Sequence, residues 1–165
     1  MKPGNLLVTP EGLTKLTDLG LASFSSDAAP AATGGPKHIV GTPDFIAPEA
    51  IANPGEVRRS SDIYSLGCTL YYAVTGKVPY PGGATRDKLR RHLEEAPLTP
   101  LRFTPNLDPA LADLIAQMMH KKPADRIGSA AEVVERLRRW TRLADENTWR
   151  QIGQFAADPG ESSFI

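Results

Sequence analysis

The sequence has little cysteine and no long hydrophobic run. Its single cysteine, Cys68, cannot form a disulfide within the chain, and no second thiol is present to build a thiolate metal site. The most apolar stretch, residues 63–74, is interrupted by polar residues and is shorter than the ~20 residues that cross a bilayer. No secretory signal is visible at the start. We therefore expect a cytoplasmic protein without a membrane segment, in which Cys68 is a small core residue.

An excess of charge of either sign is also missing. The 19 lysines and arginines balance the 19 aspartates and glutamates, so the formal net charge is +0. A neutral chain offers no overall electrostatic attraction for nucleic acid or for an anionic membrane surface, and neither partner is predicted. With 165 residues, of which 41% are hydrophobic, the chain can form one domain with a sizeable core. We expect a monomer.

The first part of the sequence has the pattern of a β-hairpin followed by a long loop. Leu6–Val8 is typical of a short buried strand, Pro10–Gly12 of a turn, and the alternation over Leu13–Thr17 of a second strand. Residues 21–40 consist largely of small and polar residues without a period. Loops of this length in compact domains are usually functional or disordered.

The rest of the sequence is predominantly helical by pattern. Residues 63–74 carry apolar side chains at helical spacing before Gly76, and Ser60, Ser61 and Asp62 offer caps at the start. Thr85–Glu95 is charged and predicts an exposed amphipathic helix. Further helices are expected after Asp108 and after Ser129, then over residues 143–155, and residues 158–165 are expected to fray. The predicted fold class is mainly α with a small β-hairpin, within the α+β group.

Several short motifs follow one another in a particular order. They are Lys2-Pro3-x-Asn5, Asp18-Leu19-Gly20, Gly41-Thr42-Pro43, Ala47-Pro48-Glu49, Asp62 and Gly67 in the apolar helix, and Arg126. Each motif is weak alone, but the order and the spacing resemble the C-terminal lobe of eukaryotic-type serine/threonine protein kinases. The resemblance implies a partial kinase domain over residues 1–141, without the N-terminal lobe, and a C-terminal extension over residues 142–165.

The resemblance implies that Asn5 and Asp18 bind ATP through the catalytic magnesium ions. Oxygen ligands suit Mg²⁺, and phosphoryl transfer needs metal ions that neutralise charge on the phosphates. A hairpin makes its two ends neighbours, so both residues could reach one metal cluster. The alternative is that Asn5 only caps its loop and that Asp18 forms an Asx-turn.

Two further positions have catalytic roles by resemblance. Lys2 places a positive charge near the transferred phosphate, and a lysine there is similar to serine/threonine kinases rather than tyrosine kinases. Thr42 stands near the catalytic loop in such kinases and helps to shape the acceptor site. Leu19 replaces the commoner phenylalanine after the metal-binding aspartate, and it keeps an apolar anchor there.

Three residues have structural roles by resemblance. Glu49 and Arg126 are expected to form a buried ion pair that ties the substrate-binding segment to the helical base. Asp62 is expected to hydrogen-bond the backbone of the catalytic loop, or else to act as a plain helix cap. Protein substrates are expected to meet the activation segment and the Thr85–Glu95 helix. Candidate phosphorylation sites in that segment are Ser23, Ser25, Ser26 and Thr33.

The proton-accepting aspartate of such kinases is not in this sequence. In the family's His-Arg-Asp-x-Lys-Pro-x-Asn pattern it falls one residue before Met1. The glycine-rich loop and the Val-Ala-x-Lys strand of the N-terminal lobe are also absent. We therefore expect that Met1 is an internal methionine of a longer kinase and that this chain alone is inactive.

Three hypotheses follow from these residues. The first is a fragment of an active serine/threonine kinase, whose upstream DNA encodes His-Arg-Asp in frame. The second is a non-catalytic, kinase-like binding or scaffold module, which would bind a partner through the Thr85–Glu95 surface without affinity for ATP. The third is a degenerate product without function, which would show upstream stop codons and no stable expression.

Overall fold

The computed structural model describes residues 1–10, 12–17, 43–53 and 57–141. The chain divides into two compact units, Met1–Arg126 and Ile127–Ile165, which are described separately. The expected loop over residues 21–40 and the expected helix over residues 143–155 lie outside the described residues. Asp18, Thr42 and the candidate phosphorylation sites lie outside them as well.

The predicted hairpin is present at the start of the first unit. A 3₁₀ turn, η1 (Pro3–Asn5), leads into β1 (Leu6–Val8), which pairs antiparallel with β2 (Thr14–Leu16). The expectation that β1 is buried is wrong for this chain. Leu7 and Val8 are 57% and 68% exposed, and among the described residues the sheet consists of these two strands alone.

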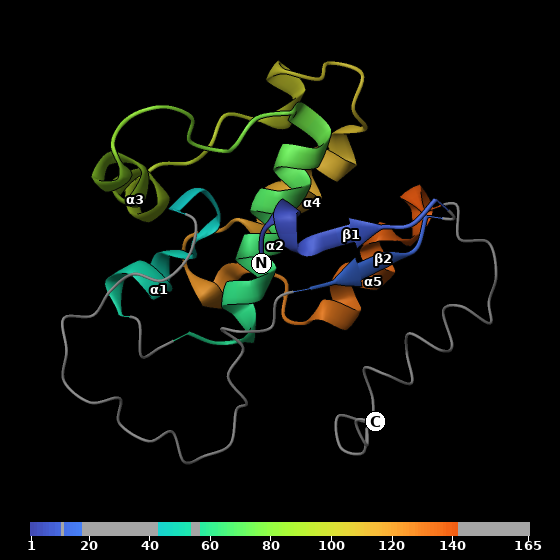
Figure 1. Ribbon diagram of the computed structural model, residues 1–165, viewed down its shortest axis with the longest axis horizontal. Coiled ribbons are helices and arrows are strands. Elements are labelled where there is room, and N and C mark those ends of the chain that lie inside the picture. Colours follow the sequence, from blue (N-terminus) through green and yellow to red (C-terminus); the bar gives the residue numbers. More distant parts are fainter. Residues whose placement is uncertain (11, 18–42, 54–56, 142–165) are drawn as a thin grey trace, which may run out of the picture. The chain divides into compact units, whose positions relative to one another are not determined.

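Helix α2 (Arg59–Thr75) is the centre of the first unit (Figure 1). Tyr64, Cys68 and Tyr71, at helical spacing, are almost completely buried, so the prediction for Cys68 is confirmed. The helix ends where expected, at Gly76, whose φ of 68° suits a residue without a Cβ.

The start of α2 differs from the expectation. The helix begins at Arg59, and the side-chain hydroxyl of Ser61 accepts a hydrogen bond from the Arg58 backbone N–H at 3.1 Å. Asp62 therefore lies inside the first turn, with an exposed side chain, and the interpretation of Asp62 as a plain N-cap is wrong.

Helix α4 (Pro109–Met118) packs against α2. Its cap is as predicted: the Asp108 carboxylate accepts a hydrogen bond from the Ala110 N–H at 2.9 Å. The helices approach closely at Gly67, where an added Cβ would lie 2.9 Å from Met118 Cβ and 2.8 Å from Met119 Cγ. The core around this contact comprises Phe45, Ala47, Tyr64, Cys68, Tyr71, Ile115 and Met119.

Two shorter elements connect the core to α3 (Thr85–Glu94). The 3₁₀ turn η2 (Pro43–Phe45) is fixed to α2 by the Ser65 hydroxyl, which donates to the Phe45 carbonyl at 2.7 Å. Helix α1 (Pro48–Ala52) follows, and α3 contacts both η2 and α1. The predicted helix and its exposure are confirmed, but its one buried side chain is His92, whereas Leu93 is 36% exposed.

The remaining elements are short. In the first unit, η4 (Pro100–Arg102) precedes α4 and η5 (Pro123–Asp125) follows it. In the second unit, α5 (Ala130–Leu137) continues into η6 (Arg138–Trp140). The Ser129 hydroxyl caps α5 as predicted, accepting from the Glu132 N–H at 3.1 Å. No helix within the described ranges is long and apolar enough to span a membrane.

Candidate functional site

The two ends of the hairpin meet at Asn5. Its backbone N–H donates to the Lys2 carbonyl at 3.0 Å, which closes the turn η1. Its carbonyl accepts from the backbone N–H of Thr17 at 2.8 Å and from the Thr17 hydroxyl at 3.3 Å. Because Thr17 directly precedes Asp18 in the sequence, the chain that carries Asp18 leaves the described hairpin beside Asn5.

The side chain of Asn5 carries an amide oxygen that could bind a metal ion. The residue is half-buried, and its carboxamide has no hydrogen-bond partner among the described residues. An amide oxygen of this kind suits Mg²⁺ as one ligand of several. Asp18 is not described, and no group of three His, Cys, Asp or Glu residues in the described part could hold a metal ion. The amide oxygen of Asn5 fits a magnesium ion, but it is one ligand of the several that the ion needs. Lys2, also half-buried, lies at the other end of the same turn.

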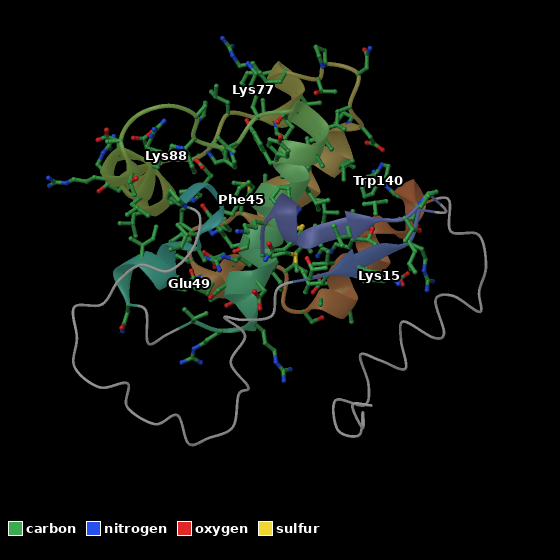
Figure 2. All side chains as sticks on the ribbon, in the orientation of Figure 1. Lys15, Phe45, Glu49, Lys77, Lys88 and Trp140 are labelled. Atoms are coloured by element: carbon green, nitrogen blue, oxygen red, sulfur yellow. The ribbon has the colours of Figure 1, made fainter. Side chains whose placement is uncertain are left out.

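Glu49 and Arg126 join α1 to the segment that follows α4. The guanidinium donates one hydrogen bond to each carboxylate oxygen, both at 2.7 Å, in a bidentate arrangement. The Arg126 side chain is fully buried, and that of Glu49 is 10% exposed. Figure 2 labels Glu49 on α1. The pair expected from the sequence is therefore formed in this chain.

The remaining hydrogen bonds of this ion pair connect further segments. Arg126 also donates to the backbone carbonyls of Ser60, His120 and Lys121 at 2.7–3.0 Å. The Ser61 hydroxyl donates to the Glu49 carboxylate at 2.6 Å. Burial by itself raises the pKa of Glu49, but the hydrogen bonds from Arg126 and Ser61 outweigh burial and hold the pKa below its ordinary value. Glu49 is therefore a satisfied, charged anchor.

Asp62 makes no hydrogen bond to the Glu49–Arg126 pair. Its carboxylate is exposed and has no hydrogen-bond partner among the described residues. Helix α2 contacts η1, the turn that contains Asn5. The predicted bond between Asp62 and the catalytic loop stays a prediction.

A buried polar cluster beneath α3 was not found from the sequence. The Tyr64 hydroxyl lies 2.9 Å from His92 Nδ1, and the Lys121 ammonium donates to the Tyr80 hydroxyl at 2.7 Å and to the His92 carbonyl at 2.8 Å. The Tyr80 hydroxyl donates to the Glu95 carbonyl. These four side chains, Tyr64, Tyr80, His92 and Lys121, are called the α3 anchor below. The only sequence signal for it is a histidine on an otherwise charged helix.

A second contact ties α3 to η2. The Lys88 ammonium lies 2.6 Å from the Asp44 carboxylate, with side chains that are 20% and 16% exposed. Figure 2 labels Lys88 on α3. Since η2 follows the predicted loop over residues 21–40 in the sequence, this pair connects α3 to the chain just after that loop.

Comparison with known proteins identifies the family. Residues 1–137 match the protein kinase domain. The chain is 35% identical to a probable serine/threonine-protein kinase PknB of Corynebacterium glutamicum, over 98% of this chain and 25% of that protein. It is 41% identical to the serine/threonine-protein kinase PknA of Mycobacterium tuberculosis, over 78% of this chain and 28% of that protein. A probable serine/threonine-protein kinase of Clostridium perfringens is 34% identical, over 81% of this chain and 19% of that protein.

These relatives are much longer than the part that the chain matches, since the chain spans between 19% and 28% of their length. The match includes the hairpin with Asn5, the Glu49–Arg126 ion pair, the core helices and α3. This chain belongs to the protein kinase family.

Proposed function

We propose that this chain is the C-terminal lobe of a serine/threonine protein kinase that transfers the γ-phosphate of ATP to serine or threonine of proteins. The observation that carries the proposal is the match of residues 1–137 to the kinase domain, together with relatives that are named serine/threonine-protein kinases. The Glu49–Arg126 pair supports the C-lobe assignment, because it ties the segment around α1 to the helical base. We further propose a monomeric, cytoplasmic protein.

The proposed phosphate site lies at the end of the hairpin. Asn5 and Asp18 would hold magnesium, which neutralises charge on the ATP phosphates when it is bound. The backbone hydrogen bond from Thr17 to Asn5 supports this role, since it brings the residue before Asp18 next to Asn5. Lys2 would interact with the transferred phosphate as a point charge. Thr42 would help to shape the acceptor site.

The proposed protein-substrate surface combines the activation segment, which contains the predicted loop over residues 21–40, with α3. The Lys88–Asp44 contact supports it, because α3 is attached directly to the residues that follow that segment. A protein substrate bound to α3 would then lie close to the segment that is expected to position the substrate's acceptor serine or threonine.

We infer that the 165-residue polypeptide by itself transfers no phosphate. The sequence contains no His-Arg-Asp motif and no glycine-rich phosphate loop. Without a proton acceptor and half of the nucleotide cleft, positioning and charge neutralisation both fail, and these supply most of the catalysis in protein kinases.

The experiment compares two polypeptides. One is this chain, and the other adds the sequence encoded in frame upstream of Met1. Incubation with ATP, magnesium and a general protein substrate should give phosphoserine or phosphothreonine with the longer polypeptide only, detected by mass spectrometry. Asn5→Ala in the longer polypeptide should abolish the product, whereas Asn106→Ala, at an exposed site, should not. A fully active Asn5→Ala variant, or upstream DNA without His-Arg-Asp, would contradict the proposal.

A scaffold function is the second candidate. It is favoured by one observation: α3 contacts η2, α1 and α2 within this chain and keeps Arg86 and Leu93 exposed. Specific binding of one protein partner by the isolated chain, lost on Arg86→Glu or Leu93→Asp in α3 and accompanied by no ATP binding, would support this function over catalysis.

A further inference from the structure

Helix α3 is attached to the rest of its unit mainly through polar side chains. Its only aliphatic residues are Leu89 and Leu93, and Leu93 is 36% exposed. The single buried side chain of the helix is His92. A helix that is polar on most sides gains little from apolar burial and depends on specific contacts instead. The position of α3 is therefore sensitive to the charge state of the groups that hold it.

His92 is buried in a setting that suits a neutral ring. Its Nδ1 lies 2.9 Å from the Tyr64 hydroxyl, and the ring packs edge-on against Tyr80 with centroids 4.7 Å apart. Its Nε2 is buried and has no hydrogen-bond partner among the described residues. A neutral ring can accept a hydrogen bond from Tyr64, whereas a protonated ring has a donor on both nitrogens. A protonated His92 would thus lose its acceptor and carry a buried charge.

Lys121 holds the C-terminal end of α3 and places a cation beside His92. Its ammonium donates to the His92 carbonyl at 2.8 Å and to the Arg91 carbonyl at 3.4 Å, carbonyls in the last turn of the helix. A lysine at a helix C-terminus satisfies such carbonyls and interacts favourably with the helix dipole. The same ammonium lies 3.3 Å from the Tyr64 hydroxyl, so His92 and Lys121 share a hydrogen-bond partner.

The carboxylates around the α3 anchor are already paired with other cations. Asp44 of η2 favours the charged form of His92 through its backbone and through its carboxylate, but that carboxylate is bound to Lys88. Glu95 is bound to Arg90, and Glu49 of α1 is bound to Arg126, whose guanidinium lies over the Tyr64 ring at 4.9 Å. Arg91 of α3 itself disfavours the charged form of His92. A proton on His92 would therefore meet the charges of Lys121 and Arg91, while the carboxylates of Asp44, Glu95 and Glu49 are already paired with other cations.

The acid–base properties follow from this arrangement. Burial, and then the charge of Lys121, lower the pKa of His92 to about 4 from an ordinary 6.5. Burial lowers the pKa of Lys121 to about 8. Both groups bind protons more weakly when α3 is docked than when they are in water, so acid favours the released helix. For His92 this effect begins below pH 6.5 and is complete near pH 4.

We propose that α3 is a proton-released element, in which protonation of His92 in the α3 anchor detaches Thr85–Glu94 while the α2–α4 core stays folded. This inference does not depend on the proposed kinase function. If α3 is also the substrate-docking surface, the same protonation weakens docking.

The test is amide hydrogen exchange of this chain between pH 7 and pH 4.5, corrected for the intrinsic rate at each pH. The protection of α3 amides should fall by about 20-fold between pH 7 and pH 5. This ratio follows from a His92 pKa of 6.5 in the released helix and about 4 in the docked helix. Amides of α2 and α4 should keep their protection. A joint loss of protection in α2, α4 and α3 would overturn the proposal, because it would show global unfolding.

Variants identify the group responsible. His92→Phe should remove the acid-dependent loss in α3, and the control His120→Gln, at an exposed histidine, should keep it. Lys121→Gln retains a hydrogen-bond donor without the charge, so the His92 ring should titrate at a higher pH. NMR titration of the His92 ring in the unmutated chain decides the matter even if a variant does not fold. A ring that titrates at about 6.5 while α3 stays protected would overturn the proposal.

Discussion

Helices α2 and α4 and helix α3 belong to the same unit, but they are held by different forces. The contact between α2 and α4 buries Cys68, Tyr71 and Ile115 in one apolar cluster. Helix α3 is held by a lysine ammonium, tyrosine hydroxyls and a salt bridge. Apolar burial does not depend on protonation, whereas buried polar contacts do. The comparison teaches that the apolar contact between α2 and α4 has no group that titrates in acid, whereas the attachment of α3 depends on buried groups that titrate.

The largest effect is expected from the Glu49–Arg126 ion pair, a polar contact that joins α1 to the segment after α4. Arg126→Ala leaves the Glu49 carboxylate buried and unpaired, and we expect the free energy of unfolding to fall by about 3–5 kcal/mol. Chemical denaturation measures this change. Arg102→Ala, at an exposed arginine in η4, is the matched control and should have little effect. An unchanged stability of Arg126→Ala would show that the ion pair does not hold α1 to the base.

Gly67→Ala tests the apolar side of the comparison. The new Cβ would lie under 3 Å from Met118 Cβ, an atom next to the α4 backbone that cannot move away easily. Overpacking at the upper end of its usual range lowers the free energy of unfolding by about 3 kcal/mol. The better helix propensity of alanine raises it by about 1 kcal/mol. We expect a net loss of about 2 kcal/mol by denaturation. Gly4→Ala, where the space around the Cβ is open, should not reproduce it.

Tyr80→Phe tests the polar side. The change removes the donor to the Glu95 carbonyl and one acceptor of Lys121, and we expect α3 to lose about 1.5 kcal/mol of local stability. Hydrogen exchange should report the loss in α3 and leave α4 unaffected. Tyr72→Phe, at a tyrosine that is 41% exposed, serves as the control. Equal losses in α3 and α4 would mean that the two regions are not separable.

The smallest effect is expected from the salt bridge between α3 and η2. Lys88→Met removes the contact with Asp44, but both side chains are partly exposed to water, so the loss should be at most about 1 kcal/mol. The loss should shrink in high salt, because ions screen such pairs. Arg90→Met removes ion pairs on the exposed face of α3 and serves as a comparison. Its loss of stability should be no larger than that of Lys88→Met. A loss of several kcal/mol for Lys88→Met would contradict this expectation, because it would show that the Lys88–Asp44 pair is as important for stability as the Glu49–Arg126 pair.

Sequence patterns predict the apolar base better than the polar attachments. Helices α2 and α4 have apolar residues at helical spacing. The end of α2 at Gly76 and the start of α4 at Asp108 agree with the prediction. The start of α2 was misplaced because Ser61 caps from within the first turn. The burial of β1 was misjudged because apolar residues in a strand do not reveal whether a second layer covers them.

The site shows the same limit. Glu49 and Arg126 could be predicted because they belong to motifs that resemble kinases. The α3 anchor could not, since Tyr64, His92 and Lys121 are separated by 28 and more residues and none of them forms a local pattern. Asn5 is placed at the end of the hairpin, and its role in metal binding stays a proposal.

The most direct test concerns that role. Manganese ions, added to the isotope-labelled chain in place of magnesium, broaden the NMR signals of nearby side-chain amides. We predict that the Asn5 carboxamide signals disappear at a lower manganese concentration than those of the exposed Asn106, and that Asp18→Asn removes the difference. If Asn5 and Asn106 broaden together, or if Asp18→Asn changes nothing, Asn5 and Asp18 do not share a metal ion.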